Sequence, residues 1–127
     1  MAVTGVTENQ GHLVVALEGE IDLEHAGNVR RTLLETLKRG GNVLVDLSKV
    51  TYIDSSGIAS LVEGLQVARK QKNDLGLVAV STRVRRVLEL ARLDKVFQIY
   101  VDLATAVAAE GTAAGTTAGA TTPAAGS

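Results

Sequence analysis

The segment VLVDLSKVTYIDSSGIASLVEGLQVARKQ, from Val43 to Gln71, decides the fold class of this chain. Its first residues, VLVDL at 43–47, form an apolar run typical of a buried parallel strand. A turn is expected at Ser48-Lys49. After IDSSG at 53–57, apolar residues recur at the spacing of one helix face, at positions 58, 61, 62, 65 and 68. A strand followed by an amphipathic helix indicates an α/β protein.

The residues before this segment predict a hairpin and a helix. The apolar run 13–17 is bounded by glycines and indicates a strand, with 3–8 as its antiparallel partner across a glycine-containing turn. Asp22 carries a typical N-cap side chain and precedes apolar residues at positions 26, 29, 33 and 37. A helix is therefore expected from Asp22 to the glycine pair Gly40-Gly41.

The residues after the segment continue the alternation. We expect a strand at 75–80, a helix capped by Ser81-Thr82, a strand at 97–101 and a short helix capped by Asp102. The element order is β-β-α-β-α-β-α-β-α. Because helices separate the strands after the hairpin, the prediction is a mostly parallel sheet with an N-terminal antiparallel hairpin and about four helices.

Length and composition indicate one domain with a tail. The chain has 127 residues, enough for a single hydrophobic core. After Glu110 only Gly, Ala, Thr, Pro and Ser occur. This segment lacks the large apolar side chains that would offset the entropy cost of ordering it. The expected organisation is a domain over 1–110 and a flexible tail over 111–127.

Charge and hydropathy exclude several classes of partner. The 13 Lys and Arg against 14 Asp and Glu give a net charge of -1, which offers no field for nucleic acid. No apolar run approaches the roughly 20 residues that span a membrane. The N-terminus has no signal-peptide pattern and the chain has no cysteine, so a cytoplasmic location is expected. Without a heptad pattern, we expect a monomer.

The polar residues outside the 53–57 segment give no clear sign of a catalytic, metal-binding or anion-binding role. Nucleotide-binding and hydrolase motifs such as GxGxxG, GxxxxGK[ST], HExxH and GxSxG are absent. Neither His12 nor His25 has a cysteine or a second histidine nearby, so both are expected to be solvent-exposed. Arg83, Arg85 and Arg86 are compatible with an anion site, but their spacing favours the solvated face of a helix.

Two acidic or hydroxyl-bearing positions leave alternatives open. Glu20 and Asp22 lie at a strand-to-helix junction. They are an acid/base pair, a cation site, or a helix cap with a neighbouring charge, and the sequence leaves these three interpretations open. In the DSSG segment, Ser55 or Ser56 is either the N-cap of the following helix or a hydroxyl placed for phosphorylation. A phosphate at this helix start would turn a nearly neutral contact surface strongly anionic.

Several segments in the same order give the chain a family resemblance. They are GEID at 19–22, the strand 43–47, DSSG at 54–57, TRVRRVLEL at 82–90 and LD at 93–94. Together they resemble the anti-sigma factor antagonists, the bacterial STAS domains. The likeness covers residues 1 to 110, and the implied fold is the STAS-type α/β fold.

The resemblance implies a regulator of transcription that is not an enzyme and needs no cofactor. Such a protein binds an anti-sigma factor and thereby frees a sigma factor. In the family the anti-sigma factor is often a serine kinase that phosphorylates the first serine of the motif, here Ser55. Phosphorylation weakens the complex, and a PP2C-type serine phosphatase restores it. The residues that the resemblance assigns to partner binding are Glu20, Asp22, Asp54, Ser55, Ser56 and Gly57.

Two other functions remain as alternatives. The chain could be a non-switching STAS adaptor subunit of a transporter or of a stressosome-like scaffold, in which Ser55 only caps its helix. Small-molecule binding at the carboxyl end of the sheet is a third candidate, supported by fold analogy alone.

Overall fold

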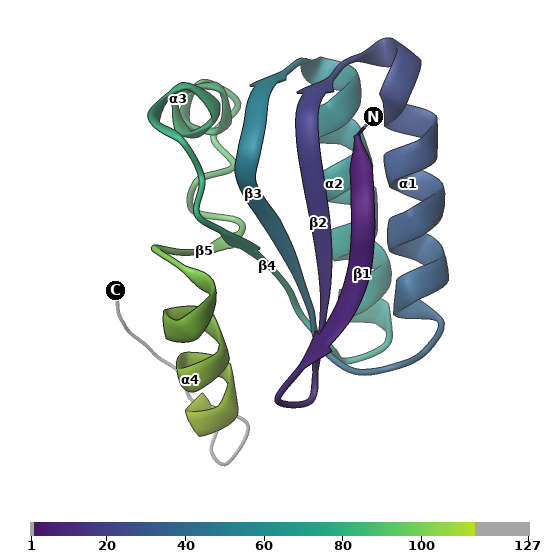
Figure 1. The fold of residues 1–127 in the computed structure, drawn as a ribbon, viewed down its shortest axis with the longest axis vertical. Coiled ribbons are helices and arrows are strands. Elements are labelled where there is room, and N and C mark those ends of the chain that lie inside the picture. Colours follow the sequence, from purple (N-terminus) through teal and green to yellow (C-terminus); the bar gives the residue numbers. More distant parts are fainter. Residues whose placement is uncertain (1, 114–127) are drawn as a thin grey trace.

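The computed structural model describes residues 2–113 and contains one five-stranded sheet in the order β1-β2-β3-β4-β5 (Figure 1). β1 is antiparallel to β2, and every other neighbouring pair is parallel. The predicted α/β class, hairpin and element order are confirmed. The strands are β1 (Val3–Asn9), β2 (His12–Ile21), β3 (Val43–Ile53), β4 (Leu75–Val78) and β5 (Gln98–Tyr100), and the helices are α1 (Leu23–Leu37), α2 (Ser55–Lys70), α3 (Thr82–Leu90) and α4 (Leu103–Ala113).

Helices cover both faces of the sheet. α1 and α2 lie side by side on one face, and α4 packs on the other (Figure 1). Because side chains along a strand alternate between faces, neighbouring residues contribute to different cores. Val15 and Val45 belong to the large core beneath α1 and α2, whereas Val14 and Leu44 pack against α4.

β3 is longer than predicted, and the turn expected at Ser48-Lys49 is wrong. The segment stays in the strand because it pairs with the second half of β2, with Lys49 opposite Glu18. Pairing continues to Ile21 opposite Ile53. Both central strands therefore end at the same level, and α1 and α2 begin there.

The remaining boundaries differ from the prediction by a few residues. β4 ends at Val78 instead of position 80, because the backbone of Ala79 takes a positive φ of 57°. The helix α4 continues to Ala113, past the boundary predicted at 110, and the predicted tail from 114 onward lies outside the described residues. Within the described part of the chain, no helix has both the length and the apolar character needed to cross a membrane.

His12 is buried, in contrast to the predicted exposed position. Its exposed fraction is 6%. His12 opens β2 and shares a strand face with Val14, which packs against α4.

Candidate functional site

The starts of α1 and α2 lie next to each other at one end of the sheet. Because Ile21 and Ile53 are in register, the residues that follow them, Asp22 and Asp54, occupy equivalent places. Each is an N-cap with extended backbone, at φ -109° and ψ -171° for Asp22 and φ -110° and ψ -172° for Asp54. The Asp54 N–H donates to the Ile21 carbonyl oxygen at 3.2 Å, which ties the two helix starts together.

Asp54, and neither serine, is the N-cap of α2. Its Oδ1 accepts hydrogen bonds from the backbone N–H groups of Ser56 at 2.9 Å and Gly57 at 3.1 Å. The Ser56 hydroxyl donates to the same oxygen at 2.5 Å, and this bond is the main reason that the pKa of Asp54 is lowered. The expected serine cap is therefore wrong. An aspartate one residue earlier reaches the same N–H groups and adds a negative charge at the positive end of the helix dipole.

The two serines of the motif have different surroundings. Ser55 is the first residue of α2, is exposed, and its hydroxyl makes no hydrogen bond to any of residues 2–113. Ser56 is half-buried and its hydroxyl is engaged by Asp54. Only the Ser55 hydroxyl is thus open to an incoming group without breaking a bond of the fold.

Gly57 lies beneath this surface. It is buried, and a Cβ built on it would lie 2.6 Å from the Ile21 carbonyl oxygen and 2.7 Å from Ile53 Cγ1. Only a glycine allows the first turn of α2 to approach the strand ends so closely. Its place indicates that it positions the turn that carries Ser55.

The two acidic residues at the strand-to-helix junction, Glu20 and Asp22, have different surroundings. Glu20 is exposed, whereas Asp22 caps α1 and accepts from the N–H groups of Glu24 at 3.1 Å and His25 at 3.2 Å. His25 Nδ1 lies 2.7 Å from the same Asp22 oxygen, and this hydrogen bond is the main cause of the lowered pKa of Asp22. His25 is therefore half-buried and hydrogen-bonded to Asp22 instead of freely exposed as predicted.

A cation is not needed to explain this acidic cluster. Ligand atoms of Asp22, Glu24 and His25 lie within 4.8 Å of one another. However, Asp22 Oδ1 already accepts hydrogen bonds from the first turn of α1 and from the histidine. The helix-cap interpretation, one of the open alternatives, accounts for the geometry.

Two exposed apolar side chains lie near the ends of β2 and β3 and were not predicted. Leu23, the first residue of α1, is 80% exposed, and Tyr52, opposite Glu20 in the sheet, is 44% exposed. Leu23 precedes Ala26 by three residues, which is the spacing of a buried helix face. No sequence signal marks it as exposed, since residue spacing does not show whether another element covers the first turn of α1.

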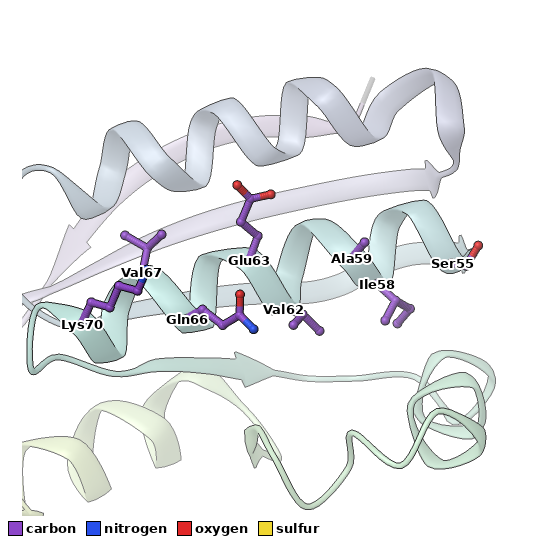
Figure 2. Close-up of a pocket in the computed structure, with 8 residues that line it drawn as sticks. All are labelled: Ser55, Ile58, Ala59, Val62, Glu63, Gln66, Val67 and Lys70. Atoms are coloured by element: carbon purple, nitrogen blue, oxygen red, sulfur yellow. The ribbon is translucent and has the colours of Figure 1, made fainter.

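The exposed side of α2 continues away from Ser55 as a shallow depression. Figure 2 shows Ser55 at the start of this helix and the other lining side chains along it. The lining is mixed apolar and polar, formed by Ser55, Ile58, Ala59, Val62, Glu63, Gln66, Val67 and Lys70. On α3 the three arginines are exposed, as expected for a solvated face.

Known proteins resemble this chain over most of its length. The anti-sigma-B factor antagonist of Bacillus subtilis is 29% identical over 94 residues, covering 74% of this chain and 86% of the relative. The intermembrane phospholipid transport system binding protein MlaB of Escherichia coli is 32% identical over 79 residues, covering 62% of this chain and 79% of that protein.

Structural comparison agrees with the sequence comparison. The crystal structure of an anti-sigma factor antagonist from Mycobacterium paratuberculosis has a TM-score of 0.77 and 29% identity, covering 85% of this chain and 93% of that chain. The STAS domain model matches residues 5–106, which include most of β1, the other four strands and the whole Ser55 region. This chain belongs to the STAS domain family.

Proposed function

We propose that this protein is an anti-sigma factor antagonist, which binds an anti-sigma factor through the surface around Ser55 and so releases a sigma factor. The similarity to the B. subtilis antagonist supports this role. The observation that carries it is the exposed Ser55 hydroxyl, which has no hydrogen bond within the described residues and stands beside the capping carboxylate of Asp54. The protein acts by binding and catalyses no reaction of its own.

The binding is switched at Ser55. An anti-sigma factor with serine kinase activity transfers the γ-phosphoryl group of ATP to Ser55 Oγ, so that an O–P bond forms, the β–γ anhydride bond breaks and ADP leaves. The phosphate adds about -1.5 to -2 charges beside Asp54 and Asp22. A contact that fitted a neutral hydroxyl then suffers charge repulsion and desolvation of a dianion, and the complex dissociates. A PP2C-type serine phosphatase hydrolyses the ester and restores binding.

The switch residue is Ser55 and not Ser56. Phosphorylation of Ser56 would require breaking its hydrogen bond to Asp54 and would place two anions at one helix cap. Ser55 loses no bond to the described residues and its phosphate extends toward solvent.

The test uses four forms of the protein against a panel of purified anti-sigma factor kinases from the host. Wild type, Ser55→Ala and Ser56→Ala should bind the same kinase with similar Kd in the presence of ADP, measured by calorimetry. Ser55→Asp should lose binding by about tenfold or more. With ATP, mass spectrometry should find phosphate on Ser55 in wild type and Ser56→Ala and none in Ser55→Ala. Equal binding by both Ser55 variants would contradict the switch.

A second candidate function is a non-switching adaptor subunit of a transporter. The similarity to MlaB, which is named as the binding protein of a phospholipid transport system, favours this alternative. An adaptor should bind its partner equally well with Ser, Ala or Asp at position 55. Capture of one transporter ATPase by all three forms, together with no binding to any kinase of the panel, would replace the antagonist function.

A further inference from the structure

We propose that Leu23 is an apolar anchor of the partner interface, filling a socket of the anti-sigma factor whose rim is cationic. This inference rests on the proposed function and adds a specificity residue to it. Leu23 and Ser55 are the first residues of α1 and α2, each following an aspartate N-cap of the same backbone conformation. The two helix starts thus present one large apolar side chain and one hydroxyl on a common surface.

The position of Leu23 beside the switch follows from the contacts of the caps. The Ile21 carbonyl oxygen, two residues before Leu23, accepts the Asp54 N–H at 3.2 Å. The Leu23 backbone N–H is near enough to the Asp54 carboxylate to contribute to its lowered pKa. Asp54 is itself bonded in sequence to Ser55, so a partner that covers the Ser55 hydroxyl meets Leu23 as well.

The Leu23 side chain makes little contact with the rest of the described domain. At 80% exposure, the side chain stabilises little of the described domain. The first helical turn would favour an acidic residue at this place, because negative charge there complements the helix dipole. A large apolar side chain held on the rigid backbone of a helix start is typical of an interface centre.

The charges around Leu23 define the partner that fits. Segments 20–24 and 50–59 contain the carboxylates of Glu20, Asp22, Glu24 and Asp54 and no Lys or Arg. The partner surface should therefore combine an apolar pocket for Leu23 with Lys or Arg around it. These cations would face the carboxylates around Leu23, whereas the contact at Ser55 fits a neutral hydroxyl. A phosphate on Ser55 therefore disrupts the complex through its size and the cost of desolvating its charge, and not through the Leu23 contact, which is apolar.

The chain offers a matched control. Leu90 at the end of α3 is 81% exposed, as Leu23 is, but belongs to an arginine-bearing helix away from the start of α1 (Figure 1). Truncating either leucine removes an exposed side chain, so both variants should melt within about 2 °C of wild type.

The experiment titrates Leu23→Ala, Leu23→Met and Leu90→Ala with the kinase of the panel that binds wild type, in the presence of ADP. Leu23→Ala should weaken Kd by about tenfold or more, and Leu23→Met should recover most of the loss because it keeps a similar apolar volume. The loss should persist at about 0.5 M salt, which screens charge contacts but not apolar ones. Leu90→Ala should bind as wild type does.

Three results would overturn the inference. If wild type binds a kinase and Leu23→Ala binds it equally well, the antagonist function stands and the anchor is wrong. If wild type binds no kinase of the panel, the proposed function fails and the anchor fails with it. An equal loss in Leu23→Ala and Leu90→Ala would also contradict the anchor, since it would show no preference for the surface at Ser55.

Discussion

The Ile21 carbonyl oxygen lies 2.6 Å from the place that a Cβ of residue 57 would occupy, and only the glycine found there avoids the clash. The same oxygen accepts the Asp54 N–H at 3.2 Å. The end of β2 therefore determines where the first turn of α2 lies and, with it, the position of Ser55.

Gly57→Ala should destabilise the domain by about 2 kcal/mol or more, because the added methyl group meets backbone and two branched side chains that cannot move aside. Urea denaturation at neutral pH measures the change. The control is Gly27→Ala in α1, where a Cβ would have no atom within 4 Å. That variant should be more stable than wild type by about 0.5 to 1 kcal/mol, since alanine favours a helix interior. Equal effects at both glycines would argue against the close approach.

Ser56→Ala should lower the melting temperature by about 3 to 6 °C, whereas Ser55→Ala should leave it within about 2 °C of wild type. The Ser56 hydroxyl donates to the charged Asp54 carboxylate at 2.5 Å, while the Ser55 hydroxyl bonds to none of residues 2–113. Differential scanning calorimetry of the two variants makes the comparison directly. A larger loss in Ser55→Ala would mean that its hydroxyl supports the fold.

Ser60→Ala should cost about 1 kcal/mol and loosen the contact between α1 and α2. The buried Ser60 hydroxyl donates to the Ala26 carbonyl oxygen of α1 at 3.0 Å and lies 3.1 Å from the Ser56 carbonyl oxygen. Hydrogen exchange should become faster in the first turns of both helices. The exposed Arg30–Glu63 ion pair also joins these helices, but its removal by Glu63→Gln should have little effect because water screens it.

Acid should weaken the domain through its helix caps. The pKa of Asp54 is lowered, mainly by the Ser56 hydroxyl, so its contribution to stability is fully present above the unfolded pKa of about 3.9. It is lost as pH falls through the lower folded pKa. Asp54→Asn keeps a cap oxygen but cannot ionise, so its stability should fall less steeply below about pH 4. Urea midpoints at a series of pH values test this, and parallel curves for the two proteins would contradict it.

The contribution of Asp74 to stability should change with pH in the opposite direction to that of Asp54. Burial raises its pKa, although the Leu75 N–H, 2.9 Å from its Oδ1, favours the charged form. Ionisation therefore costs stability as pH rises from the unfolded pKa through the folded one. Asp74→Asn keeps the acceptor for Leu75 and removes the charge, so it should gain stability relative to wild type between about pH 4 and pH 7. Unchanged relative stability across that range would show that the carboxyl is effectively solvated.

Hydrophobic periodicity was sufficient to predict the element order, the α/β class and the Asp22 cap of α1. These features depend on local patterns, since apolar runs and helix-face spacings specify which elements form and a single cap former precedes α1. The importance of the DSSG segment was likewise visible as a helix start rich in hydroxyl groups. Local pattern could not choose the cap among Asp54, Ser55 and Ser56, because all three residue types cap helices well.

That choice depended on the neighbouring strand. The bond from Asp54 to Ile21 and the close approach of Gly57 place Asp54 where its carboxylate reaches the free N–H groups, and Ser55 is thereby left exposed. Pairing with β2 also kept Ser48 and Lys49 in a strand. The exposure of Leu23 and the burial of His12 follow from which surfaces the sheet and helices cover. Burial is a relation between distant segments, so residue spacing predicts a helix face but only packing decides whether anything lies against it.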